Sequence, residues 1–417
     1  MSRYHSYLNT SVGIIGRYDG SVPLAVFLRS FFAAGKKYGA KDRKQISHLC
    51  YCYYRTGKMF KGNTLPDDDA IREYILAGLF LCSSQPNEML QQLKPAWNTN
   101  VHLSIEEKCA IVHPAYNTPP LTAYHAPLTT PCSPLSVFPW RTALSEGIDH
   151  EAFCRSFFSQ PDLFIRIRPG HNTAVQRKLD AADIPYRFVN AHGMAFPNTT
   201  KLDTVIELNK EAVIQDYSSQ QVAEFLSSLQ RDQQLSVWDC CAASGGKSIL
   251  AKDILKNIKL TVSDIRKSIL INLEKRFASA GIKPYTARVA DLTNPLFTLH
   301  PSPFAAQQYG FDLIICDAPC SGSGTWARTP EQLYFWKEED ISHYTTIQKK
   351  ILANIIPFIK PGGHLLYITC SVFKKENEAM VDEIKERFKL QLLKMEVLKG
   401  YDKKTDTLFA ALLTLPK

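Results

Sequence analysis

The stretch "SVWDCCAASGGKS", residues 236–248, sets a short apolar run before a loop of small residues and the start of an expected helix. Its Gly-Lys-Ser ending resembles a phosphate-binding loop, but that motif requires a glycine at the position of Cys241. Hydrolysis of a nucleoside triphosphate is therefore a poor interpretation. Small residues after a strand still let the backbone approach a ligand closely, so the loop is a candidate cofactor site.

Short apolar runs alternate with longer segments, several of them with helical spacing, from this stretch onward. The runs cover residues 236–239, 260–264, 286–291, 311–317 and 364–370. This alternation predicts an α/β fold with a doubly wound parallel sheet. Ligands bind at the carboxyl ends of such strands, so we expect Asp264 to accept hydrogen bonds from a ribose and Asp291 to contact a base. Because G-x-G-x-x-G is absent, S-adenosylmethionine fits better than a dinucleotide.

The first hundred residues follow a helical period instead. Apolar stripes occur at residues 24–31, 46–53 and 71–79, with Asp42 available as an N-cap for the second. Seven prolines between His113 and Pro139 predict a linker, since proline sustains neither helix nor central strand.

These patterns divide the chain into three expected domains. An all-α domain covers residues 1–135 and ends in the proline-rich linker. A small α+β subdomain covers residues 136–205, with a helix expected near residues 174–182, and the sheet described above occupies residues 206–417.

The strand-like "LFIRIR" in the subdomain alternates strictly. Leu163, Ile165 and Ile167 share one face, and Arg166 and Arg168 share the other. A basic sheet face could contact an RNA phosphate backbone, although exposed strand arginines without that role are commoner.

Charge and cysteine content bound the function further. Residues 1–62 hold eleven Lys or Arg and two acids, a surplus equal to the net charge of +9 of the whole chain. This favours a nucleic-acid partner, with an ordinary solvated basic surface as the alternative. No apolar segment is long enough to span a bilayer, and eleven scattered cysteines suit a reducing compartment, so we expect a cytoplasmic protein.

Two cysteines lie at the ends of predicted neighbouring strands. Cys320 is in "DAPCSGSG", and Cys370 ends "LLYITC". A single cysteine is most often a packed core residue, but two at such positions suggest chemistry. Zinc is not expected, because Cys50-x-Cys52 and the pair Cys240 and Cys241 have no second matching pair.

With these motifs the sequence resembles the RNA cytosine-5 methyltransferases, and most the bacterial small-subunit ribosomal RNA methyltransferase B type. The resemblance covers about residues 160–380, and the joint presence of "DAPCSG" and "TCS" is highly specific. The helical N-terminal region also resembles an RNA-binding module of the antitermination factor NusB type. The matching pieces are "IQDYSSQ" at 214–220, "CCAASGGKS" at 240–248, Asp264, Asp291, "DAPCSGSG" at 317–324, Arg328-x-Pro330-Glu331 and "YITCSVFKKEN" at 367–377.

The resemblance implies a Rossmann-like methyltransferase sheet, S-adenosylmethionine as cofactor and ribosomal RNA as partner. Cys370 would attack carbon-6 of a cytosine, because a thiolate there turns carbon-5 into a nucleophile. Asp317 would hydrogen-bond the pyrimidine edge, and Cys320 would assist loss of the carbon-5 proton as a base, directly or through water. A helix expected to begin near Lys374 or Lys375 would favour the Cys370 thiolate.

The same resemblance implies the remaining contacts. We expect no metal, and we expect a monomer. Arg166, Arg168 and Arg328 would contact RNA. The cofactor would contact Cys241, Ala242, Ala243, Ser244, Gly245, Gly246, Lys247, Asp264, Asp291 and Asp317.

Two departures from the family pattern stand out. Ser244 replaces a usual proline, which we expect to loosen the cofactor loop, and "TDTLFAALLTLPK" replaces the usual final strand. Two other readings stay open: a non-catalytic RNA-binding assembly factor, and the same chemistry on tRNA. An adenine amino-methyltransferase is disfavoured, because "DAPC" lacks the Asn/Asp-Pro-Pro-aromatic turn.

Overall fold

The computed structural model describes residues 3–35, 37–62, 66–112, 132–295 and 310–417, so most of the predicted linker at 113–139 lies outside the described residues. The chain forms two compact units. The first comprises Met1–Thr142, Asp149–Gln160 and Trp326–Trp336, and the second comprises Ala143–Ile148, Pro161–Thr325 and Lys337–Lys417. The subdomain expected at residues 136–205 is thus divided between the two units.

The first unit is helical, as its apolar stripes indicate. The three predicted helices are present, and their buried faces form one core with α1. Asp67 caps α4, whereas Asp42 lies inside α3 and accepts a hydrogen bond from Gly39 N at 2.8 Å, so its N-cap assignment is wrong. The helices are α1 (Arg3–Ile15), α2 (Leu24–Ala34), α3 (Ala40–Arg55), α4 (Asp68–Cys82), α5 (Glu88–Leu93), α6 (Pro95–Asn98), α7 (Ile105–Val112), α8 (His150–Ser156) and α15 (Pro330–Phe335).

Helix α15 comes from far along the chain and completes the first unit. The ring centroids of Tyr334 and Tyr53 lie 5.6 Å apart, and Lys58 Nζ donates to the carbonyl of Tyr334 at 2.8 Å. Glu331 Oε1 accepts a hydrogen bond from Leu24 N at 3.1 Å, at the start of α2. Residues 326–336 therefore belong with the helices, although their sequence neighbours form the large sheet.

A small antiparallel sheet in the second unit has the order β2-β3-β1-β4. Its strands are β1 (Leu163–Ile167), β2 (Arg187–Phe188), β3 (Gly193–Phe196) and β4 (Ala212–Ile214), with α9 (Asn172–Ala181) against it. Ile165 and Ile167 pack in the core between this sheet and α9, which confirms the predicted alternation of β1.

The large sheet of the second unit has seven strands in the order β10-β11-β9-β8-β5-β6-β7. Strands β9, β8, β5, β6 and β7 are parallel, and β11 and β10 continue the sheet antiparallel. The doubly wound prediction is confirmed. The strands are β5 (Leu235–Asp239), β6 (Ile258–Asp264), β7 (Tyr285–Val289), β8 (Phe311–Asp317), β9 (Ile359–Thr369), β10 (Gln391–Leu398) and β11 (Leu408–Thr414).

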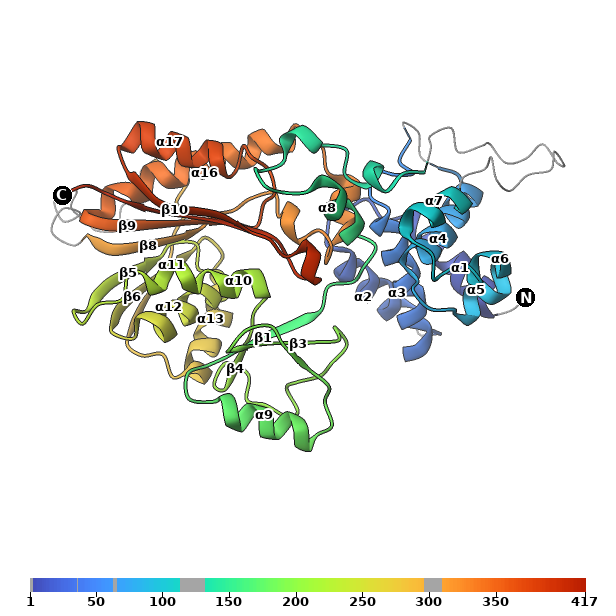
Figure 1. Cartoon of the computed structure of the whole chain (residues 1–417), viewed down its shortest axis with the longest axis horizontal. Coiled ribbons are helices and arrows are strands. Elements are labelled where there is room, and N and C mark those ends of the chain that lie inside the picture. Colours follow the sequence, from blue (N-terminus) through green and yellow to red (C-terminus); the bar gives the residue numbers. More distant parts are fainter. Residues whose placement is uncertain (1–2, 36, 63–65, 113–131, 296–309) are drawn as a thin grey trace. The chain divides into compact units, whose positions relative to one another are not determined.

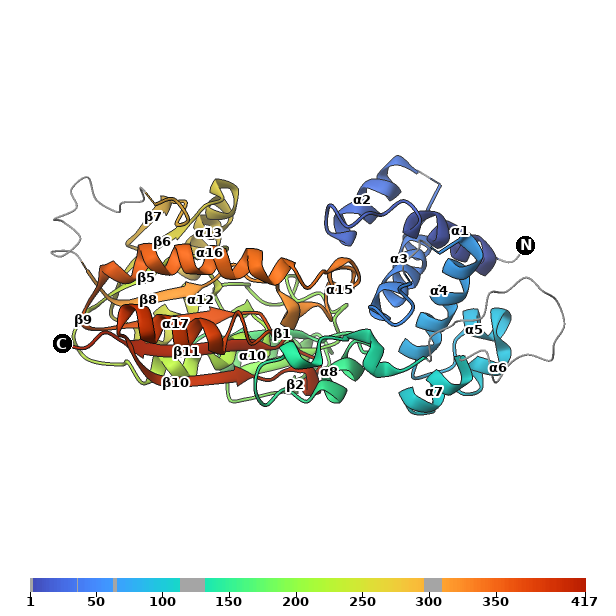
Figure 2. The same ribbon diagram turned by 90° about the horizontal axis from the view of Figure 1, so that it is seen from above.

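Helices cover both faces of this sheet because successive strand residues point to opposite sides. Val237 packs with α11 (Ala223–Ser227), α12 (Gly246–Leu255) and α13 (Lys267–Ala280). Trp238 packs on the other face with α16 (Asp340–Ile355) and α17 (Glu378–Phe388), which run side by side in Figures 1 and 2. The carboxyl ends of the parallel strands are left for ligands. No helix in the described ranges is long and apolar enough to cross a membrane.

Candidate active site

The backbone of the loop between β5 and α12 has a conformation that lets a ligand approach it closely. Ala243 has φ 46° and Gly245 has φ 85°, a left-handed conformation that suits glycine. A Cβ on Gly245 would stand 2.6 Å from the ring of Phe277, so the loop also needs glycine for packing. Beside Gly246 a Cβ would meet nothing within 4 Å, which leaves open space at the first turn of α12.

Side chains from neighbouring elements hold this loop. Asp264, at the end of β6, accepts a hydrogen bond from Ala243 N at 3.0 Å. Arg276 of α13 donates to the carbonyl and hydroxyl of Ser244 at 3.0 and 2.7 Å. Ser244 therefore tethers the loop to α13, and the loosening expected from the replacement of proline stays a prediction.

The two acids predicted to contact the cofactor differ in environment. Asp264 is buried, and Arg266 Nε also donates to it at 3.0 Å. Asp291 is exposed, lies two residues beyond the end of β7, and accepts hydrogen bonds from the hydroxyl and backbone of Thr293. These bonds lower the pKa of Asp291, so it is a carboxylate at neutral pH.

Lys247 joins the cofactor loop to the predicted base-reading acid. Its buried Nζ donates to Asp317 Oδ2 at 3.1 Å and to Ser219 Oγ at 2.8 Å. Ser219 belongs to the "IQDYSSQ" segment, and 32% of the Asp317 side chain is exposed. The structure thus brings together three motifs that the sequence separates by up to about a hundred residues.

The two predicted reactive thiols face each other. Cys320 Sγ and Cys370 Sγ lie 3.3 Å apart, and both residues are half-buried. They follow β8 and β9, which are adjacent parallel strands. The hydrogen bond with Cys370, together with burial, raises the pKa of Cys320 well above its ordinary value. Cys320 is therefore a thiol at neutral pH.

The expected helix end beside Cys370 is not there. Helix α17 begins at Glu378, and Lys374 Nζ binds Glu146 Oε1 at 2.9 Å in an exposed ion pair. The predicted start near Lys374 or Lys375 is wrong, because residues 374–377 form a turn whose side chains serve other contacts. One of these residues, Glu376, was not singled out from the sequence, although it lies within the quoted "YITCSVFKKEN".

Gly324 is a second residue for which the sequence predicted no role. Its backbone N donates to the carbonyl of Cys370 at 2.8 Å, and a Cβ at this position would overlap the backbone of Thr407. The glycine in "SGSG" could have indicated this contact, since glycine is required where two backbones approach closely.

The arginines of β1 do not form an exposed basic face. Arg166 Nη1 binds Asp253 Oδ2 at 2.7 Å, and Arg168 Nη2 binds Asp253 Oδ1 at 2.8 Å. Only 7% and 14% of the two arginine side chains are exposed. The expectation of a free sheet surface for RNA is therefore wrong for this pair. Arg328 lies in the first unit, within residues 326–336, and its RNA contact stays a prediction.

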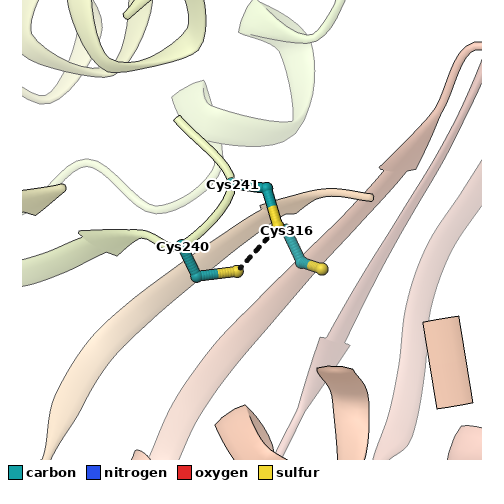
Figure 3. Close-up of side chains that lie close together, drawn as sticks. All are labelled: Cys240, Cys241 and Cys316. Carbon is teal, nitrogen blue, oxygen red and sulfur yellow. Dashed lines mark hydrogen bonds between the residues drawn. The ribbon is translucent and has the colours of Figure 1, made fainter. Parts of the chain in front are cut away.

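A second group of sulfurs lies at the ends of β5 and β8. The Sγ atoms of Cys240, Cys241 and Cys316 all lie within 4.8 Å of one another. Figure 3 shows these three side chains close together. Cys316 is fully buried. Burial raises the pKa of Cys240 well above its ordinary value. The three side chains pack with the hydrophobic core that includes α16, and the expected absence of a metal stays a prediction.

Comparison with known proteins shows what this part of the chain is similar to. Residues 226–416 match the family model described as 16S rRNA methyltransferase RsmB/F. The Ribosomal RNA small subunit methyltransferase B of Proteus mirabilis is 32% identical over 196 residues, which is 44% of this chain and 43% of that protein. The match therefore spans less than half the length of this curated relative.

Solved structures share the fold. The crystal structure of PH0851 superposes with a TM-score of 0.67 at 19% identity, over 100% of this chain and 99% of that one. NSun6 from Pyrococcus horikoshii with SFG superposes with a TM-score of 0.51 at 14% identity, over 62% and 92%. Residues 226–416, which carry the cofactor loop and the thiol pair, are thus similar to the RsmB/F methyltransferases.

Proposed function

We propose that the chain methylates carbon-5 of a cytosine in RNA, with S-adenosylmethionine as methyl donor and small-subunit ribosomal RNA as substrate. The observation that carries this proposal is the 3.3 Å separation of Cys320 Sγ and Cys370 Sγ at the ends of adjacent strands. The family match supports methylation of RNA. Two facing thiols add the cytosine chemistry, because one can attack the ring while the other acts at the neighbouring carbon.

The cofactor loop fits S-adenosylmethionine. Residues 241–247 would hold its methionine part against the open space beside Gly246, and Asp264 would hold the ribose. SFG, bound in the NSun6 structure, is an analogue of this cofactor, which supports the same assignment here. When bound, S-adenosylmethionine supplies an electrophilic methyl group.

Cys370 would act as the nucleophile. Its thiolate adds to carbon-6, the carbon-5 to carbon-6 double bond is lost, and carbon-5 becomes nucleophilic. Asp317 would hydrogen-bond the ring nitrogen and amino group as charge develops there. Lys247 orients Asp317 through their 3.1 Å contact, so the base-reading acid is held by the cofactor loop. A stacked cytosine must leave its stack to reach these groups.

Cys320 would act in the release step. The proton on carbon-5 must leave before the double bond re-forms and the Cys370 thiolate departs. Cys320 would assist this loss as a base, directly or through a water molecule, because it lies next to the sulfur that is bonded to the ring. Removing Cys320 should therefore leave the enzyme trapped on its product.

The test is covalent trapping. Wild type, Cys320→Ala and Cys370→Ala are incubated with ribosomal RNA or tRNA transcripts and S-adenosylmethionine, then run on a denaturing gel. We expect an RNA adduct to accumulate with Cys320→Ala, and neither adduct nor 5-methylcytidine with Cys370→Ala. Cys316→Ala, which alters a buried thiol of β8, is the matched control and should behave as wild type. Normal methylation by Cys370→Ala would contradict the nucleophile assignment, and turnover only on tRNA would contradict the substrate.

The first unit would contribute RNA binding. Its exposed cations on and beside α2 and α3 support contact with phosphates, as in the NusB-type module that this region resembles. We expect RNA affinity to fall steeply with salt, and to fall less steeply when these cations are replaced. They are Arg29, Lys37, Lys41, Arg43 and Lys44.

A further inference from the structure

A buried carboxylate lies in the turn before α17. Glu376 is 0% exposed, and its two oxygens accept four hydrogen bonds. Oε1 accepts from Ser321 N at 2.9 Å and from Gln348 Nε2 at 3.2 Å. Oε2 accepts from Ser321 Oγ at 2.6 Å and from Ser371 Oγ at 2.5 Å. One side chain therefore ties the loop after β8 to the loop after β9.

The two serines are the immediate chain neighbours of the thiol pair. Ser321 follows Cys320, and Ser371 follows Cys370. We propose that Glu376 is a positioning residue that fixes the separation of the two sulfurs. This inference rests on the proposed function, in which the sulfurs must serve carbon-6 and carbon-5, two adjacent atoms of one ring.

The sheet alone does not set this separation. The ladder between β8 and β9 ends with the pairing of Asp317 and Ile368, before either cysteine is reached. Beyond that point the loops are joined by contacts such as Gly324 N to Cys370 O and by the bonds to Glu376. A shift of either loop would change the distance between the thiols without breaking the ladder.

The chemistry of Glu376 makes it hard to replace. Burial raises its pKa, and the hydrogen bonds from Ser321, Ser371 and Gln348 oppose that shift by favouring the carboxylate. Glutamine keeps the shape, but its amide donates at one of the two oxygens, where the carboxylate accepts. Because each serine hydroxyl can turn to accept from that amide, Glu376→Gln replaces two charge-assisted hydrogen bonds by weaker neutral ones and leaves the volume of the core unchanged.

The first measurement does not depend on methylation. Purified protein is treated with diamide, and formation of the Cys320–Cys370 disulfide is followed by peptide mass spectrometry. We expect the rate to fall at least fivefold in Glu376→Gln. Glu378→Gln is the matched control, because Glu378 is also buried and accepts from Ser145 Oγ at 2.9 Å and Glu146 N at 3.0 Å, away from either loop serine. It should react at the wild-type rate.

The second measurement uses RNA turnover. In Glu376→Gln we expect kcat to fall at least tenfold while KM for RNA stays within threefold, because the substrate surface is intact and only the thiols are displaced. Adding Ser371→Ala to Glu376→Gln should lower kcat by a smaller factor than Ser371→Ala does in the wild type, since the two changes share the bond between Ser371 Oγ and Glu376. A purely structural role would instead lower thermal stability and leave kcat of the folded protein unchanged.

The outcomes separate the two proposals. Slow disulfide formation in Glu376→Gln, in a preparation whose wild type methylates no cytosine, would uphold the positioning role and contradict the proposed function. A wild-type rate of disulfide formation in Glu376→Gln would overturn the positioning role, whatever the RNA assay shows. If Glu376→Gln does not fold, Ser371→Ala removes a single hydroxyl and is held to the same fivefold threshold.

Discussion

Asp253 of α12 should be among the most costly side chains of the second unit to remove. It pairs with Arg166 at 2.7 Å and with Arg168 at 2.8 Å, and only 4% of its side chain is exposed. Asp253→Ala leaves two buried guanidinium groups without their carboxylate. Removing one partner of a buried ion pair costs about 3–5 kcal/mol, so we expect a loss of about 4 kcal/mol in the free energy of unfolding.

The assay is reversible unfolding of the full chain, followed by a probe in the second unit such as the fluorescence of the buried Trp238. For a unit of this size, each kcal/mol shifts Tm by roughly 2–4 °C, so the expected drop is about 10 °C. Glu207→Ala is the control. Glu207 and Lys210 form an exposed ion pair with a separation of 2.9 Å, which should contribute nothing measurable to the free energy of unfolding.

A loss below about 1 kcal/mol in Asp253→Ala would refute the reasoning from burial. The strand arginines give a second check. If Arg168→Ala weakened RNA binding and its salt dependence without lowering Tm, the RNA role suggested by the sequence would stand and the structural role would fall.

Two further predictions concern the large sheet. Burial raises the pKa of Asp239 to about 7, so between about pH 4 and 7 the folded state keeps a proton that the unfolded state has lost, and stability from this group falls as pH rises. The free energy of unfolding of Asp239→Asn, relative to that of the wild type, should therefore rise by about 4 kcal/mol between pH 4 and pH 8. Denaturant unfolding measures this difference, and a difference that does not change with pH would contradict the prediction. Gly324→Ala should lower the free energy of unfolding by about 1–3 kcal/mol, because its Cβ would overlap the backbone of Thr407. The same change should remove most of the methylation activity. Gly13→Ala, whose Cβ meets nothing within 4 Å, should lower neither in parallel unfolding and activity assays.

The large sheet could be predicted because its signals are local. Each strand is a short apolar run, and the Asp317, Cys320 and Cys370 positions follow directly from the ends of β8 and β9. In a parallel sheet the chain order of such strands and helices restricts the topology strongly. The facing of the two thiols therefore follows from the adjacency of two strands.

The errors arose where a side chain finds its partner far along the chain. The residues next to Arg166 and Arg168 in the sequence do not indicate that Asp253 is their partner. The alternation in β1 would be the same if the two side chains faced solvent. The predicted start of α17 was a few residues too early. Glu376 and Asn377 form buried hydrogen bonds with Ser371 in a turn, and the first helical turn follows them. Periodicity reports which face a residue occupies but not which residue lies against it.

The placement of α15 in the first unit has a consequence for synthesis of the protein. Helices α1 to α8 are complete on the ribosome long before Tyr334 and Phe335 exist, yet these rings cover Tyr53 and Tyr54 of α3. At 5–20 residues per second, roughly 10 to 35 s separate the end of α8 from residue 336. During that interval the nascent helical unit exposes an aromatic surface to solvent, which makes it a natural client for chaperones and a poor candidate for expression as an isolated fragment.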